Sequence, residues 1–97
     1  MKLLTKEILA KLPPIGSQES NPDPTVVVKF FDPCGSWTWY ATEFDPATGE
    51  FFGLVDGFEQ ELGYFHLAEL ESVRGPLGLG IERDLHWTPR PLSQVKK

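Results

Sequence analysis

Residues 37–66 read WTWYATEFDPATGEFFGLVDGFEQELGYFH, and this stretch decides the fold. It contains three strand-like runs, at 37–44, 51–56 and 61–66, rich in aromatic and aliphatic residues. The segments between them, DPATG at 45–49 and GFEQ at 57–60, carry the Asp, Pro and Gly residues that favour turns. The stretch therefore predicts three antiparallel strands joined by two hairpin loops.

Successive side chains of a strand point to opposite faces, which predicts the two faces of the first run. One face should carry Trp37, Trp39, Ala41 and Glu43. The other should carry Thr38, Tyr40, Thr42 and Phe44. A four-residue second loop would place Gly53 opposite Tyr64 and Leu54 opposite Gly63, so that bulky side chains cover both glycines. A slip of one residue would exchange the faces.

Two further strands are predicted outside this stretch. The run from Thr25 to Phe31 contains three consecutive valines, which is typical of a strand covered on both faces. Residues 32–36 read as a turn. The run from Ile81 to Trp87 alternates between apolar and charged residues and predicts another strand, with Arg83 on the apolar face, where it must be paired or extended toward solvent.

Two short helices complete the prediction. Thr5 can cap a helix that runs to Leu12, with Leu4, Ile8 and Leu12 on one stripe. Two prolines at 13–14 end it. The segment Leu67–Val73 predicts a second helix. The fold class is therefore α+β: an antiparallel sheet of four or five strands with both helices packed on it.

The 97 residues fit one domain, 1–97, with a mobile loop at 13–24 and a frayed tail at 88–97. The lone Cys34 cannot form an internal disulfide, and no apolar run approaches the ~20 residues of a membrane span. Charged residues follow the N-terminus too soon for a signal peptide. We therefore expect a cytoplasmic protein that does not contact membranes.

Charge is distributed unevenly along the chain. The formal net charge is −5, and between Phe30 and Val73 there are nine carboxylates and no lysine or arginine. Such a segment should project a negative field that attracts basic partners and repels nucleic acid. The basic residues lie toward the two ends without a sustained stripe, so direct nucleic-acid binding is not expected.

Six segments together resemble a known family: Leu3–Ile8, Val26–Phe31, Ser36–Tyr40, Phe51–Gly57, Glu61–Phe65 and Leu70–Leu79. They are similar to a family of short bacterial proteins catalogued as domain of unknown function 2958, and the resemblance covers almost the whole chain. Members often look to be carried on plasmids and other mobile elements. The resemblance implies an accessory protein and supplies no activity, cofactor or catalytic residue.

The leading functional hypothesis is a non-enzymatic protein-interaction module that binds a basic host or element protein through its acidic surface. Electrostatic attraction would speed association, and one or two aromatic anchors would prolong binding. The acidic members should lie on or near hairpin ends, and the anchors in the first strand. The predicted partner-binding residues are Glu43, Asp45, Asp56, Glu59, Glu61, Trp39 and Tyr40. The alternative reading of the carboxylates is a solvated face that maintains solubility.

A second hypothesis is a small enzyme or anion-binding protein that uses an arginine–carboxylate cluster around residues 74–84. Its candidate residues are Glu71, Arg74, Glu82, Arg83 and Asp84. The same residues can instead pin the glycine-rich loop as structural ion pairs. A cavity that gathers them would favour the ligand site, and guanidinium groups engaged in pairing would favour the structural role.

No motif predicts a cofactor or a metal. His66 and His86 lack the spacing of a metal-binding motif, and Cys34 has no cationic neighbour in its turn. The three glycines at 75, 78 and 80 are not followed by the Lys-Ser/Thr pair of a phosphate-binding loop. Catalysis is therefore unsupported by the sequence.

Overall fold

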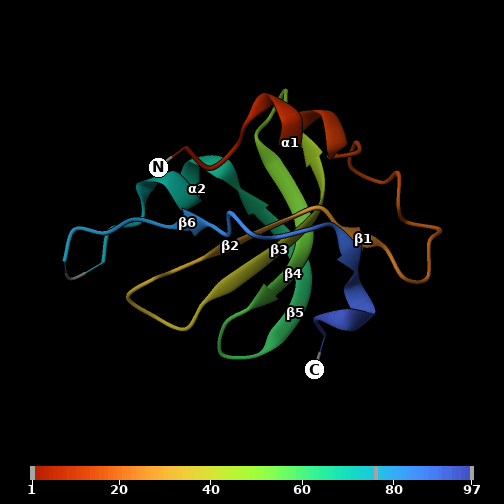
Figure 1. Ribbon diagram of the computed structural model, residues 1–97. Helices are drawn as coiled ribbons and strands as arrows, with labels where there is room; N and C mark the ends of the chain where they lie inside the picture. Colours follow the sequence, from red (N-terminus) through yellow and green to blue (C-terminus); the bar gives the residue numbers. More distant parts are fainter. Residues whose placement is uncertain (1, 76, 97) are drawn as a thin grey trace.

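The computed structural model describes residues 2–75 and 77–96; Met1, Pro76 and Lys97 lie outside the described residues (Figure 1). A five-stranded antiparallel sheet with the order β5-β4-β3-β2-β6 forms its centre. Its strands are β2 (Val28–Phe31), β3 (Thr38–Asp45), β4 (Glu50–Asp56), β5 (Gln60–His66) and β6 (Glu82–Arg83). A second, two-stranded sheet pairs β1 (Thr25–Val26) with β7 (Arg90–Pro91). Together with the two short helices, this confirms the predicted α+β class.

Both helices form where the sequence predicts them. Helix α1 spans Lys6–Lys11, and the Thr5 hydroxyl accepts a hydrogen bond from the Ile8 N–H at 3.2 Å. Its apolar stripe joins the main core, in which Leu4 and Leu12 are buried. Helix α2 spans Leu67–Ser72 and buries Leu70. Because both helices contribute to one core cluster, they cover the same face of the sheet, here called the helix face.

Aromatic rings fill the helix face. The Phe51 ring, which is fully buried, lies 5.4 Å from Phe30, 4.5 Å from Phe44 and 5.1 Å from Phe65. These four rings come from β2, β3, β4 and β5, so they connect the strands side by side. Burial of these four aromatic rings contributes strongly to the stability of the helix face.

The opposite face, here called the strap face, is covered by residues 84–95, the C-terminal strap. Leu92 of the strap packs with Val26 and Leu54 in a smaller core. Trp87 borders this core and donates a hydrogen bond from Nε1 to the Val26 carbonyl at 3.1 Å. The strap also contains β7 and the 3₁₀ helix Leu92–Gln94. The prediction of a frayed tail from 88 is therefore corrected for residues 90–95, which pair and pack.

The predicted strand at 25–31 is interrupted at Val27, which donates its N–H to the Ala41 carbonyl at 2.9 Å. Before this point β1 pairs with the strap, and after it β2 pairs with β3 and β6. Val26 belongs to the core of the strap face, whereas Val28 belongs to that of the helix face. The expectation that the valine run is covered on both faces is confirmed.

A β-bulge in β3 corrects the predicted alternation. Ala41 pairs with Gly53 and Glu43 pairs with Phe52, so Thr42 is the extra residue between them. From this point the faces exchange: Glu43 lies on the strap face and Phe44 reaches the aromatic core. The bulge thus lets Phe44 join the buried rings without placing a carboxylate among them.

The register between β4 and β5 also differs from the prediction. The loop has three residues instead of four, so Gly53 pairs with Gly63 and Phe52 pairs with Tyr64. The predicted pairing of Gly53 with Tyr64 is wrong by one residue. The observed register places Phe65 opposite Phe51 on the helix face, where the two rings stack. This gain in aromatic packing accounts for the shorter loop.

The run from Ile81 to Trp87 is not one strand. Only Glu82–Arg83 pairs with β2, and the chain then turns at Asp84, whose carboxylate accepts the His86 N–H at 2.9 Å. Ile81 is buried on the helix face, while Trp87 borders the core of the strap face. The turn therefore carries the chain from one side of the sheet to the other, which a continuous strand could not do.

Candidate functional site

The five predicted acidic residues do not share one surface. Asp45 ends β3 at the first hairpin, where its carboxylate accepts the Ala47 N–H at 2.9 Å. Asp56, Glu59 and Glu61 lie at the second hairpin, at the other end of β4. Glu43 is only 4% exposed. The prediction of a single acidic surface therefore needs correction, because one member is inside the protein and another is at the opposite end of the sheet.

The predicted aromatic anchors also separate. Trp39 packs against the helix-face core, and Tyr40 packs on the strap face with its ring 5.8 Å from Trp87. Burial raises the pKa of Tyr40 above its ordinary value, and the charge of Asp56 adds to this shift. Both rings are partly covered by the protein itself, so neither is well placed as an anchor.

The aromatic residue at the second hairpin is much more exposed. Phe58 is 95% exposed, and its ring meets Trp37 edge-on at 5.4 Å. A Cβ at Gly57 would lie 2.6 Å from the Trp37 ring, so glycine permits this contact. Trp37, Val55, Phe58, Glu59 and Glu61 line a groove of about 270 Å³. We call this groove, together with Asp56, the hairpin tip.

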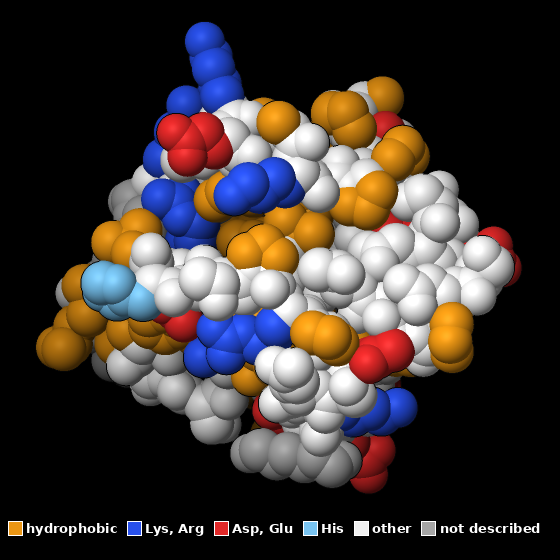
Figure 2. Space-filling view, turned by 45° about the vertical axis from the view of Figure 1, so that its right-hand side comes forward, with side chains coloured by type: hydrophobic (Ala, Val, Ile, Leu, Met, Phe, Trp, Pro, Cys, Tyr) orange, Lys and Arg blue, Asp and Glu red, His pale blue; other side chains and the backbone are white. Residues whose placement is uncertain are grey.

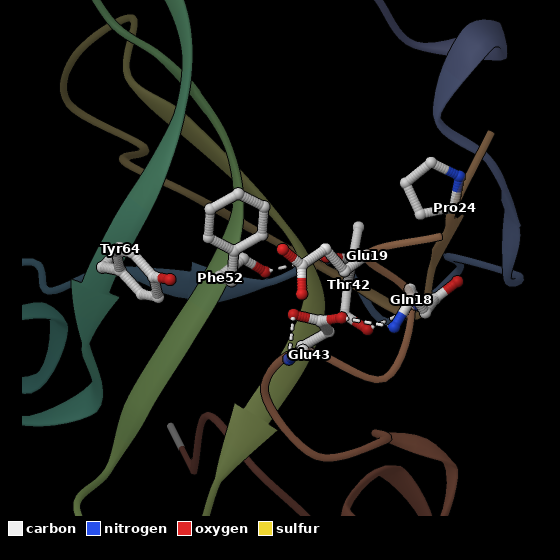
Figure 3. Close-up of a pocket in the computed structure, with 8 residues that line it drawn as sticks. Gln18, Glu19, Pro24, Thr42, Glu43, Phe52 and Tyr64 are labelled. Atoms are coloured by element: carbon white, nitrogen blue, oxygen red, sulfur yellow. Dashed lines mark hydrogen bonds between the residues drawn. The ribbon is translucent and has the colours of Figure 1, made fainter. Parts of the chain in front are cut away.

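A pocket of about 170 Å³ lies between the 13–24 loop and strands β3 to β5 (Figure 3). We call it the acidic pocket, because two carboxylates and two aromatic rings are among its lining residues. The lining consists of Gly16, Gln18, Glu19, Pro24, Thr42, Glu43, Phe52 and Tyr64. In Figure 3, Glu19 and Glu43 lie to one side of the Phe52 ring, and Tyr64 lies to the other side.

The bulge and the loop hold the Glu43 carboxylate in place. Its Oε1 accepts the Gly16 N–H at 2.9 Å, and its Oε2 accepts the Gln18 N–H at 2.6 Å. The bulged Thr42 donates its hydroxyl to the Phe52 carbonyl at 3.0 Å. Two N–H donors stabilise a buried carboxylate but do not cancel its charge. The pocket therefore retains negative charge beside two aromatic rings.

Gln18 attaches the loop to the sheet. Its Nε2 donates to the carbonyls of Thr25 at 3.1 Å and Thr42 at 2.8 Å. Its Oε1 accepts the Thr25 N–H at 2.8 Å. The Pro13 carbonyl accepts the Phe44 N–H at 2.9 Å and fixes the start of the loop. The prediction of a mobile loop at 13–24 did not anticipate these contacts, which make the loop a wall of the pocket.

The structure does not gather the arginine–carboxylate cluster. Glu71, Arg74 and Glu82 line one groove of about 510 Å³, whereas Arg83 and Asp84 line another of about 310 Å³. Arg74 donates to its neighbouring carbonyls, those of Glu71 at 2.8 Å and Val73 at 2.7 Å. A guanidinium group that donates hydrogen bonds to main-chain carbonyls has fewer donors left for a ligand. These contacts therefore favour a structural role of the cluster over a ligand site.

Arg83 has the same kind of contact, because it donates to the Lys2 carbonyl and so fixes the segment before α1. Asp84 faces Lys29 at 3.9 Å. Arg90 stacks on Trp87, with its guanidinium carbon 4.1 Å from the ring centroid. Each of these charged groups holds neighbouring segments together.

The space-filling view shows a face on which Lys and Arg side chains surround a hollow with hydrophobic side chains in it (Figure 2). The groove of about 310 Å³ between α1 and the strap combines Ile8, Val27 and Val28 with the charged Lys11 and Arg83. Glu7 and Asp84 line the same groove, so its charge is mixed. The acidic pocket and the hairpin tip, by contrast, have no lysine or arginine among their lining residues within the described part of the chain.

Neither a metal site nor a membrane span is found in the described part of the chain. No three His, Cys, Asp or Glu side chains within residues 2–75 and 77–96 are placed to hold a metal ion. In the same residues, no helix has the length and apolar character to cross a bilayer. Cys34 is exposed, with its thiol not engaged in a disulfide.

Sequence reasoning missed Gln18, Glu19, Phe52 and Tyr64 as site residues. Phe52 and Tyr64 form a cross-strand aromatic pair, with ring centroids 5.0 Å apart. The correct three-residue loop would have revealed this pair, because it places the two residues opposite each other. Nothing in the sequence around Gln18 and Glu19 indicated a site, because these two residues meet Glu43 only as a result of the bulge in β3.

No curated protein and no solved structure matches the chain. A family model described as protein of unknown function (DUF2958) matches residues 3–96, which is nearly the whole chain. This confirms the resemblance seen in the sequence, and the chain belongs to the DUF2958 family.

Proposed function

We propose that this protein is a non-enzymatic interaction module that binds a basic protein by receiving one lysine or arginine side chain in the acidic pocket. The observation that carries the proposal is the pairing of the Glu19 and Glu43 carboxylates with the Phe52 and Tyr64 rings around one cavity. Carboxylates attract a cation, and aromatic rings bind its partly desolvated alkyl stem or charged end. The geometry thus fits a basic side chain better than a neutral one.

The size of the pocket supports a side chain over a small-molecule substrate. Its volume of about 170 Å³ is below the range of roughly 300–1,000 Å³ that is usual for small-molecule sites. The end of one long side chain needs much less room than a whole substrate. The rest of the partner would then lie across the strap face outside the pocket.

The hairpin tip supplies a second contact of matching character. Glu59 and Glu61 line one groove with the exposed Phe58, and Asp56 ends β4 at the same hairpin. Among the described residues, neither the Lys29–Asp84 contact nor the Glu50–His66 contact involves these three carboxylates. Exposed carboxylates mainly accelerate association with a cationic partner, and this effect weakens with salt. The tip should therefore control the association rate, while the pocket controls the lifetime of the complex.

The pocket can be tested with ethylguanidinium, a probe that mimics the end of an arginine side chain. Amide chemical shifts in ¹⁵N-labelled protein should change saturably around Gln18, Glu43 and Tyr64. Replacing the exposed Glu19 by glutamine keeps the shape of the side chain and removes one charge, so Glu19→Gln should weaken binding several-fold. The matched control Glu7→Gln changes an exposed glutamate on α1 and should leave binding unchanged.

Two outcomes would contradict the pocket proposal. One is a set of small, unsaturable shifts spread over all acidic residues. The other is equal binding by the wild type and Glu19→Gln.

For the hairpin tip, the combined change Asp56→Lys, Glu59→Lys and Glu61→Lys should slow association with a hexa-arginine peptide and make the association rate less dependent on salt. An unchanged association rate would show that the hairpin tip does not take part in binding. The test of the acidic pocket does not depend on this result.

A further inference from the structure

The two outer strands of the sheet differ greatly in length. On one side β6 has only two residues, whereas on the other β5 has seven. In the part of the chain that the structure describes, no strand pairs with the outer side of β5. An outer strand presents main-chain N–H and carbonyl groups, which can hydrogen-bond to a strand of another chain.

β5 also lacks the features that usually protect a sheet edge. It contains no proline, and its apolar Leu62 and Tyr64 are 51% and 61% exposed on the strap face. Between them lies Gly63, where an added Cβ would meet no atom within 4 Å. That Cβ would project from the helix face, so a side chain introduced at Gly63 meets no steric obstacle within its own copy. Glu61 is the one acidic residue of the strand.

We propose that β5 pairs antiparallel with β5 of a second copy, with the two-fold axis at Gly63. In this register each Leu62 lies opposite Tyr64 of the other copy, so both exposed side chains gain an apolar neighbour. Glycine faces glycine at the axis, so no two side chains are opposed on the helix face at this position. The two sheets become one continuous sheet of ten strands.

The neighbouring registers match less well. Moving the axis to Tyr64 places Leu62 opposite His66, and moving it to Leu62 places Tyr64 opposite Gln60. Each change leaves one self-pair at the axis, Tyr64–Tyr64 or Leu62–Leu62, and replaces the two Leu62–Tyr64 pairs with two mixed pairs. Only the axis at Gly63 pairs Leu62 with Tyr64 at both ends of the contact, so this two-fold register gives every exposed apolar side chain of β5 an apolar partner.

Charge allows this pairing but keeps it weak. In the proposed register Glu61 lies opposite Phe65, and the two copies of Glu61 are about 13 Å apart, from four residues at ~3.3 Å each. No carboxylate of β5 therefore faces another directly. The net charge of −5 on each copy still opposes association, so added salt should strengthen the dimer. Salt should instead weaken the binding of a basic partner, so the two interactions can be distinguished by their opposite dependence on salt.

Disulfide trapping tests the register directly. Gly63→Cys in a Cys34→Ser background places two thiols opposite each other at the axis, where mild oxidation should give a covalent dimer. The matched variant Glu61→Cys in the same background also carries one exposed cysteine, but its two copies would be too far apart to bond. Efficient cross-linking at 63 and little at 61 is expected. Equal cross-linking of both variants, or none at 63, would overturn the proposal.

Sedimentation velocity tests the association without cysteines. The sedimentation coefficient of the wild type should rise with protein concentration, and more so at higher salt. Leu62→Lys introduces a charge beside the axis and should abolish the rise. The control Leu85→Lys alters a leucine that is 63% exposed on the strap, away from β5, and should leave it unchanged. A wild type that stays monomeric up to millimolar concentration, or a Leu62→Lys variant that still associates, contradicts the dimer.

Discussion

The two faces of the central sheet belong to the same strands, but the rest of the chain covers them to different extents. On the helix face, four phenylalanines from four strands meet around the fully buried Phe51. On the strap face, the buried core consists of Val26, Leu54 and Leu92, and Tyr64 on the same face remains 61% exposed. The helix face thus provides stability, while the strap face provides the acidic pocket and the exposed rings from which binding is inferred.

The largest effect is expected from a cavity on the helix face. Phe51→Ala removes a ring with three aromatic neighbours and should lower the free energy of unfolding by about 3–5 kcal/mol. Urea denaturation followed by circular dichroism measures this change. The matched control Phe58→Ala removes the same side chain from a 95% exposed site and should cost less than about 0.5 kcal/mol. Similar losses in both variants would mean that the helix face does not dominate stability.

A smaller effect is expected from the core of the strap face. Leu92→Ala should lower the free energy of unfolding by about 2 kcal/mol, since fewer buried side chains surround Leu92 than Phe51. Hydrogen exchange should become faster at Val26 and in β7 before it changes in β4, because the strap would open locally. If exchange accelerated equally throughout the sheet, the two faces would unfold as one cooperative unit, and the strap face would not be the less stable of the two.

The smallest effect concerns Tyr40 on the strap face. Burial raises the pKa of Tyr40 above its ordinary value of 10.0, and the Asp56 charge contributes less. A raised pKa in the folded state means that this contribution to stability is full below pH 10.0 and is lost as the pH rises through the Tyr40 pKa.

Asp56→Asn removes one of the two causes and should lower the pKa of Tyr40 without returning it to the ordinary value. The ¹³Cζ resonance of Tyr40 reports this titration. An unchanged Tyr40 pKa in Asp56→Asn would show that burial alone raises the Tyr40 pKa.

Features set by neighbouring residues were predictable from the sequence. Thr5 and the spacing of Leu4, Ile8 and Leu12 identify α1, because capping and amphipathic spacing act within a few residues. The valine run at 26–28 likewise indicated burial on both faces. The hairpin loop at residues 46–49 was predictable from its Pro and Gly.

Features set by distant contacts were not predictable. Three or four loop residues suit the segment after Asp56 equally well, and stacking of Phe51 on Phe65 decides between them. The bulge at Thr42 brings Glu43 to N–H donors from Gly16 and Gln18, which are more than 20 residues away in the chain. Alternation alone therefore placed Glu43 on the wrong face and left the acidic pocket out of the predicted site.

The side-chain amide of Gln18 contacts the main chain as another peptide group would. It exchanges hydrogen bonds with both the N–H and the carbonyl of Thr25, and it also reaches the carbonyl of Thr42. The main-chain groups that anchor the loop therefore belong to β1 and β3. Because the contacts of the hairpins 38–66 are short in sequence and those of Gln18 to Thr42 are long, we expect the hairpins to form early and the N-terminal segment to close over them late.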